Sequence, residues 1–149
     1  MPLKEQLNSD LRDSMRSQNE VRKGTIRLIL SAVHNAEIAA GKPLDDAGIN
    51  VVLAREAKQR RESIEEFGKA GRADLVAKES AELEVVLEYL PPQLSREEIE
   101  ATVRPLIAQL GAKGPSDKGK VMGPVMAQLR GKADGSVINE VVTQLLANT

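Results

Sequence analysis

The sequence predicts an all-α protein built from two small helical domains. Strong helix formers such as Ala, Leu, Glu, Lys and Arg dominate its 149 residues. Apolar residues recur at spacings of three and four, and no stretch alternates apolar and polar residues as a half-buried strand would. The segment YLPPQLS interrupts the helical pattern, because proline does not fit a helix interior. We therefore expect an N-terminal helical domain with a long linker helix over residues 1–90. A C-terminal three-helix domain over residues 91–149 follows, and a partly helical linker joins the two.

The first half of the chain is expected to form four helices. An apolar residue at every fourth position marks the first, and residues 20–40, apolar on most sides, predict the most buried helix of the bundle. Gly41 is typical of a helix end. Asp45 or Asp46 can cap the third helix, whose apolar face is interrupted by Arg60. A break near Gly68 and Gly71 then separates it from the fourth helix. The apolar positions are Leu3, Leu7, Leu11 and Met15 in the first helix, and Ile49, Leu53, Ala57, Ile64 and Phe67 in the third.

Three further helices are expected after the double proline. Ser95 and Glu98 have the spacing of a capping box, which predicts a helix start. Pro105 predicts a kink or break within that helix, and Gly111 predicts its end. Ser116 or Asp117 can cap the next helix, and Asp134 or Ser136 can cap the last.

The stretch GPSDKGKV, residues 114–121, has the spacing of a phosphate-binding P-loop up to its last residue. Val121 stands where the Ser or Thr that holds Mg²⁺ would be. The motif must also join a strand to a helix, and the residues before it have helical spacing. Pro124 fits only a first helical turn or a kink. These features argue against a nucleotide site.

The longer stretch DKGKVMGPVMAQLRGKADGSVINEVV, residues 117–142, closely resembles the C-terminal signature of the YqeY family. The segments IRLILSAVHNAEIAAGK, REAKQRRESIEEFGKAGRADL and EYLPPQLSREEI resemble the N-terminal domain and linker of that family, so the resemblance covers nearly the whole chain. The family fold consists of two small helical domains. Its C-terminal module is also the tail domain of GatB, a subunit of the tRNA-dependent amidotransferases. Lys118 departs from the pattern, since the family more often has an apolar residue there.

The glycines of this signature have structural roles that require no nucleotide. Gly119 and Gly123 are four residues apart, so they share a helix face on which another helix could approach closely. Gly131 and Gly135 flank a sharp turn that calls for a positive φ angle.

The cations of the signature region are the candidate binding residues. The segment 113–132 has a single acid, Asp117, and the resemblance favours contact of its cations with tRNA phosphates. A second basic cluster, formed by Arg55, Lys58, Arg60 and Arg61, could contact RNA or a partner. A solvated helix face with the pairs Lys58/Glu62, Arg61/Glu65 and Glu65/Lys69 is the simpler interpretation. The candidate RNA-binding residues are Lys113, Lys118, Lys120, Arg130 and Lys132, with Arg55, Lys58 and Arg61 as secondary contacts.

No catalytic residue, metal ligand or cofactor is expected. The chain has no Cys, and its single His, His34, lacks partner ligands. Tyr89 is expected to pack at the linker rather than to stack on a base, because base-stacking surfaces array several aromatics. No apolar run is long enough to cross a membrane, and the N-terminal residues lack a signal-peptide pattern, so a cytoplasmic protein is expected.

Three functions remain open from the sequence. The first is a non-catalytic module that binds tRNA or a tRNA-bound complex through its C-terminal cations. The second is a protein–protein adaptor for a translation-related partner, which the formal net charge of −1 favours. The third is an accessory to glutamine-dependent carbon–nitrogen ligation, implied only by the relation to GatB.

Overall fold

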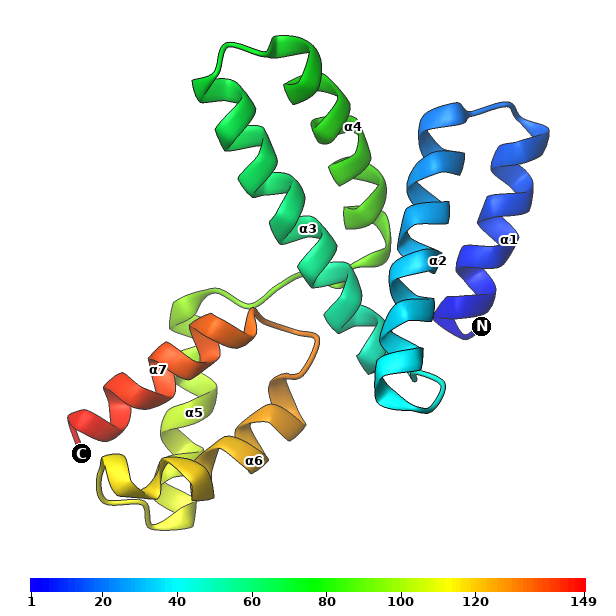
Figure 1. The fold of residues 1–149 in the computed structure, drawn as a ribbon. Coiled ribbons are helices and arrows are strands. Elements are labelled where there is room, and N and C mark those ends of the chain that lie inside the picture. Colours follow the sequence, from blue (N-terminus) through cyan, green and yellow to red (C-terminus); the bar gives the residue numbers. More distant parts are fainter. The chain divides into compact units, whose positions relative to one another are not determined.

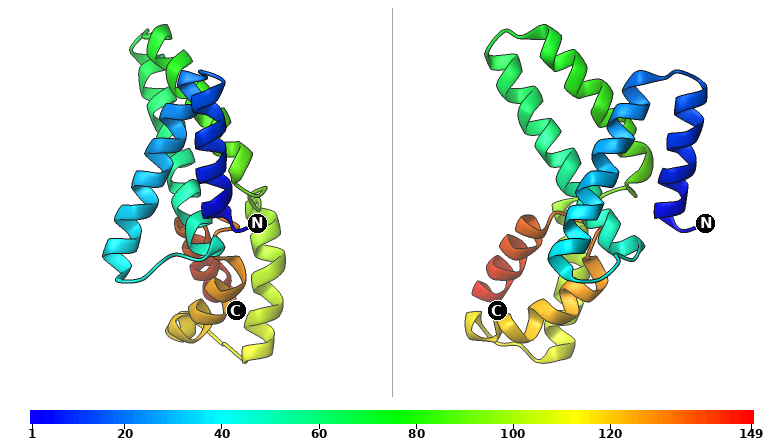
Figure 2. Two further views of the ribbon diagram at one scale, coloured as in Figure 1. Left: turned by 90° about the vertical axis from the view of Figure 1, so that its right-hand side faces the viewer. Right: turned by 45° about the vertical axis from the view of Figure 1, so that its right-hand side comes forward.

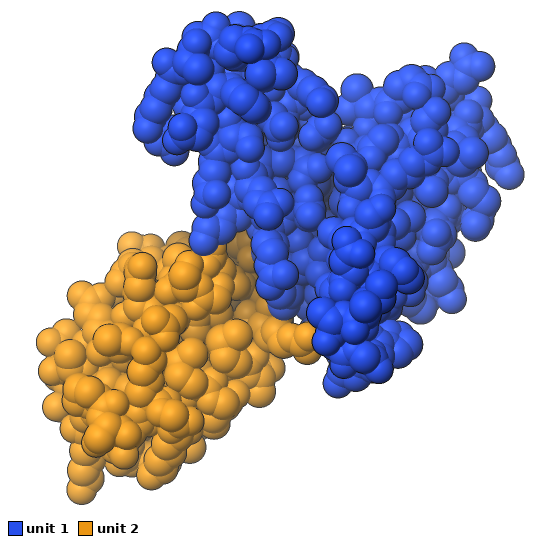
Figure 3. All heavy atoms as spheres, viewed as in Figure 1, with its two compact units in different colours: residues 1–91 blue, residues 92–149 orange.

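The computed structural model describes residues 1–149 as seven α-helices and one short 3₁₀ helix without any strand, which confirms the all-α prediction (Figure 1). The chain divides into two compact units, Met1–Pro91 (unit 1) and Pro92–Thr149 (unit 2), coloured separately in Figure 3. Unit 1 contains α1 (Leu3–Arg16), α2 (Glu20–Ala40), α3 (Asp46–Lys69) and α4 (Ala73–Tyr89), and unit 2 contains α5 (Arg96–Leu110), the 3₁₀ helix η1 (Pro115–Asp117), α6 (Lys118–Leu129) and α7 (Gly135–Ala147).

Helix boundaries follow local capping chemistry. The Asp45 carboxylate accepts a hydrogen bond from the backbone N–H of Gly48, and Ser95 and Glu98 form the expected capping box. Gly41 and Gly111 end α2 and α5 in the left-handed conformation. The break between α3 and α4 falls at Gly71, whose φ is 71°, while Gly68 lies within α3.

Unit 1 consists of two helical hairpins, α1–α2 and α3–α4. Its core contains Leu7 of α1, Ile29 of α2, Leu53 of α3 and Val86 of α4, each fully buried. The expectation that α2 is the most buried helix of the bundle is wrong, because four of its 21 residues are buried, against six of 24 in α3. Three large apolar side chains of α2 are exposed: Val21, Leu28 and Ile38.

The far half of the α3–α4 hairpin has no core of its own. None of the residues from 61 to 84, called the arm below, is buried. The last buried residue of α3 is Arg60 and the first of α4 is Val85. The arm extends beyond the ends of α1 and α2 in all three ribbon views (Figures 1 and 2).

Unit 2 packs α5, α6 and α7 pairwise around one apolar core. Pro105 lies inside α5 and Pro124 inside α6, and both helices continue through them. The expected break at Pro105 is therefore absent. Each proline removes one backbone hydrogen bond, and burial of the residues around it offsets this loss. In α5 those buried residues are Val103, Leu106 and Ile107.

Candidate nucleic-acid interface

Helix α6 presents the cations of the signature region because its opposite side is part of the core. Val121, Val125 and Leu129 recur every four residues and are buried. Val121 is thus a core residue of unit 2. The segment GPSDKGK follows α5 and η1 rather than a strand, so the structure lacks the strand–loop–helix arrangement that a P-loop needs.

The candidate cations are accessible. Lys113, Lys120, Arg130 and Lys132 are exposed, and Lys118 is half-buried. The four lysines make no ion pair within the structure. Their charges are therefore available to an external anion.

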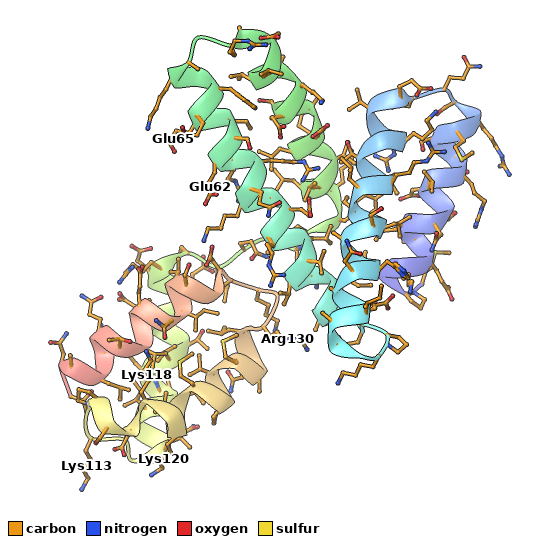
Figure 4. All side chains as sticks on the ribbon, in the orientation of Figure 1. Glu62, Glu65, Lys113, Lys118, Lys120 and Arg130 are labelled. Carbon is orange, nitrogen blue, oxygen red and sulfur yellow. The ribbon has the colours of Figure 1, made fainter.

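The structure places these cations in two groups. Lys113, Lys118 and Lys120 lie near the N-terminal end of α6, whereas Arg130 lies at its C-terminal end (Figure 4). Twelve helical residues span about 18 Å. This separation exceeds the spacing of neighbouring phosphates on one strand, so the two groups would contact different phosphates. We call them the α6 amino-end group (Lys113, Lys118 and Lys120) and the α6 carboxyl-end group (Arg130 and Lys132).

Ser116 or Asp117 was expected to cap α6, but neither side chain does, and that of Asp117 makes a different bond. Its Oδ2 atom accepts a hydrogen bond from the backbone N–H of Lys113 at 2.9 Å. This bond closes the loop between α5 and α6. It also holds a negative charge near the start of α6, which is favourable for the helix dipole.

The glycines of α6 do not mediate helix packing, so that expectation is wrong. A Cβ atom built on Gly119 or Gly123 would meet nothing within 4 Å apart from its own helix and chain neighbours. Gly123 has a local explanation, because it precedes Pro124. The proline ring clashes with the Cβ of a preceding residue in the helical conformation, and glycine has none. Gly119 has no such neighbour, so it leaves the α6 backbone open on the exposed side.

The turn after α6 is held by defined contacts. Gly131 has φ of 78°, as expected, whereas Gly135 lies within α7 with an ordinary helical backbone. The N–H of Leu94 donates to the carbonyl of Lys132 at 2.8 Å. The carboxylate of Asp134 accepts from the N–H of Ser136 and caps α7. The α6 carboxyl-end group therefore sits on a fixed backbone.

The secondary basic cluster on α3 is divided between two environments. Arg55, Lys58 and Arg61 are exposed, whereas Arg60 is buried. Arg60 forms ion pairs with Glu56 at 2.6 Å and with Glu82 of α4 at 3.4 Å. The sequence signal for this inward position was the place of Arg60 on an otherwise apolar face. Of the predicted intrahelical pairs, Glu65–Lys69 is present at 3.4 Å.

Tyr89 packs within unit 1, as expected. Its hydroxyl donates to the carboxylate of Asp10, and Nη2 of Arg22 donates to the Tyr89 oxygen at 3.0 Å. The Arg22 guanidinium also lies 5.8 Å from the ring centroid. Burial, followed by the hydrogen bond to Asp10, raises the pKa of Tyr89 above its usual value. These contacts tie α1, α2 and α4 together.

The structure also locates the other groups considered for chemistry. His34 is exposed on α2. No group of three or more His, Cys, Asp or Glu residues is arranged to hold a metal ion. No helix combines the length and the apolar character that a membrane span requires.

This geometry defines a class of small all-α proteins. They have two helical units, and one helix of the second unit carries cations at both ends. Residues 4–146 match the family described as Yqey-like protein. The chain therefore belongs to the YqeY family, and the resemblance of its motifs to that family is confirmed.

Fungal proteins named altered inheritance of mitochondria protein 41, mitochondrial, are similar to this chain. The Lachancea thermotolerans protein is 41% identical over 113 residues, which are 74% of this chain and 60% of that protein. The Pyrenophora tritici-repentis protein is 33% identical over 143 residues, covering 94% of this chain and 78% of that protein. The Kluyveromyces lactis protein is 39% identical over 113 residues, or 74% of this chain and 61% of that protein.

The names of these relatives contradict the expectation of a cytoplasmic protein, because they describe mitochondrial proteins. The expectation rested on composition and on the N-terminal residues. These two kinds of evidence do not distinguish one aqueous compartment from another. The expectation therefore had no physical basis for choosing the cytoplasm over the mitochondrion. The names describe no catalytic activity.

Proposed function

We propose that this protein is a non-catalytic helical module that binds the backbone of tRNA, or of a tRNA-bound complex, through unit 2. The observation that carries the proposal is the pair of cationic groups at the two ends of α6. Each group can neutralise phosphates and release the counterions condensed on them. The resemblance of residues 117–142 to the tail of GatB suggests tRNA as the nucleic acid.

The geometry favours contact with the backbone rather than with bases. Four of the five candidate cations are lysines, which are point charges without the fixed fork that reads a base edge. Unit 2 contains no Trp, Tyr or Phe on which a base could stack. The exposed Gly119 lets an RNA strand approach the α6 backbone between Lys118 and Lys120. Binding should therefore depend strongly on salt and weakly on sequence.

The salt dependence of tRNA binding tests the proposal. In the full-length chain, Lys120→Ala combined with Lys132→Ala removes one exposed cation from each end of α6. We expect weaker binding at every salt concentration and a log–log salt slope lower by about 1–2. Filter binding of a labelled tRNA transcript across a salt series measures both.

A matched control removes the same charge elsewhere. Arg12 and Lys42 are exposed on unit 1 and make no ion pair. Arg12→Ala with Lys42→Ala should leave the slope unchanged. Equal slopes for the wild-type chain and the Lys120/Lys132 variant would rule out the proposed surface.

A protein–protein adaptor without RNA binding is the second candidate, favoured by the near-neutral charge of the whole chain. Affinity purification with and without nuclease separates the two. If a defined protein partner is still recovered after nuclease treatment and no RNA is retained, this candidate is favoured. A role in amidotransfer ranks below both, and glutamine-dependent conversion of misacylated Glu-tRNA by the purified chain alone would establish it.

A further inference from the structure

The arm of unit 1 carries apolar surface that its own fold leaves partly uncovered. Ile64 and Phe67 of α3 and Leu75 and Val76 of α4 are only half-buried. Leu28, on the neighbouring helix α2, is 51% exposed. Residues 61–84 carry four Lys or Arg and seven Asp or Glu, so this surface is acidic, unlike that of α6.

A pocket of about 350 Å³ lies at the base of the arm. That volume is within the range of ligand-binding pockets. Three helices line it, and five of the lining side chains are charged. The residues used below are Leu28 of α2, Glu56 and Arg60 of α3, and Lys78, Glu79 and Glu82 of α4.

Arg60 is the buried centre of this pocket, with a relative exposure of 6%. Its Nη1 atom donates to the carboxylate of Glu56 at 2.6 Å. Its Nε atom lies 3.4 Å from the carboxylate of Glu82, yet this buried N–H has no hydrogen-bond partner. This atom has almost no accessible surface, so Arg60 is held by Glu56 and Glu82 and its Nε–H is out of reach of an acceptor from outside.

The charges of the pocket decide which kind of ligand it can bind. Glu56 and Glu82 together neutralise Arg60 and leave one excess negative charge. Lys78 and Glu79 also line the pocket and make no ion pair, so the five charged groups have a net charge of −1. Three carboxylates would repel a phosphate or another anion. A cation suits the site better.

A polypeptide segment can supply a cation together with an apolar side chain. We propose that this pocket docks a segment of a protein partner in which a Lys or Arg stands next to an apolar residue. The basic side chain pairs with Glu79, and the apolar side chain covers Leu28. This inference concerns unit 1 and is independent of RNA binding by unit 2.

Selection from a random library of displayed twelve-residue peptides on the full-length chain tests the proposal. Enriched peptides should carry Lys or Arg beside Leu, Ile, Met or Phe. In nuclear magnetic resonance titrations these peptides should shift the backbone signals of Gln59 and Ser63, which also line the pocket. The Nε–H signal of Arg60 should shift as well. Absence of enriched peptides, or enrichment of acidic ones, would overturn the proposal.

Two variants with the same change of charge sharpen the test. Glu79→Gln removes the unpaired carboxylate of the pocket and should weaken peptide binding about two- to fivefold, the range of a partly exposed ion pair. Glu62→Gln is the control, because Glu62 points away from α4 (Figure 4). It should leave the affinity unchanged. Equal affinities of the two variants would contradict docking in the pocket. If tRNA shifts the Arg60 Nε–H signal and no peptide does, the pocket binds RNA and the proposal is overturned.

Discussion

The two units differ in how their exposed charges are supported. In unit 2 the cations flank α6, whose other side packs against α5 and α7. In unit 1 the arm carries an excess of acids and contains no buried residue. A rigid cationic helix suits a charged polymer backbone, whereas a half-covered acidic hairpin suits a partner that can complete its packing. The comparison suggests that one chain can present two surfaces of opposite chemistry.

Core substitutions should have the largest effects and should test whether the units are separate domains. Leu53 in unit 1 and Leu146 in unit 2 are fully buried. Replacing either with Ala should cost about 2–5 kcal/mol, through lost burial and the cavity left behind. If each unit is a domain, each substitution destabilises only its own unit. Residue-resolved hydrogen exchange of the full-length chain measures both units at once, and equal loss in the two would show a single cooperative domain.

Replacing Tyr89 with Phe should have an intermediate effect confined to unit 1. The change removes the hydroxyl that donates to Asp10 and accepts from Arg22, at a cost of about 1–2 kcal/mol. Urea unfolding measures this loss. An unchanged midpoint would show that the hydrogen bond between Tyr89 and Asp10 contributes nothing to stability.

The same residue makes a prediction about pH. The pKa of Tyr89 is raised in the folded chain, so folding favours the protonated phenol. This contribution is fully present below the unfolded pKa of about 10 and is lost as the pH rises through the higher folded pKa. Above pH 10 the wild-type chain should therefore lose stability more steeply than Tyr89→Phe. Parallel curves for the two proteins would contradict the assignment.

The smallest expected change in stability is at Gly119. A Cβ atom at this position would meet no neighbouring atom within 4 Å, and the backbone is helical. Gly119→Ala should therefore stabilise unit 2 by about 0.5 kcal/mol. The added methyl group should nevertheless weaken tRNA binding, because it blocks close approach to α6. Thermal melting and filter binding on the same preparation check the two effects. A variant that is more stable and binds equally well would place the RNA elsewhere.

Features that depend on neighbouring residues could be predicted from the sequence. The cap at Asp45, the capping box at Ser95 and the left-handed Gly41 and Gly111 each involve only a few adjacent residues. The separation of the α6 cations was also present in the sequence, since a helix of 12 residues divides them.

Features that depend on distant packing were missed. Continuity of α5 through Pro105 rests on burial against other helices. Leu28 is exposed because the helices that pack on α2 leave that side of it uncovered. The pocket requires Glu82 of α4 to meet Arg60 of α3, and no local pattern specifies that pairing. An arginine on an apolar helix face was the only available sign.

Titration of the isotope-labelled full-length chain with a tRNA transcript tests the central claim most directly. The account predicts that backbone signals at both ends of α6 shift, including Gly119, Lys120 and Lys132, and that signals of the arm remain in place. Shifts confined to the arm, or no shifts at tRNA concentrations that saturate filter binding, would contradict it.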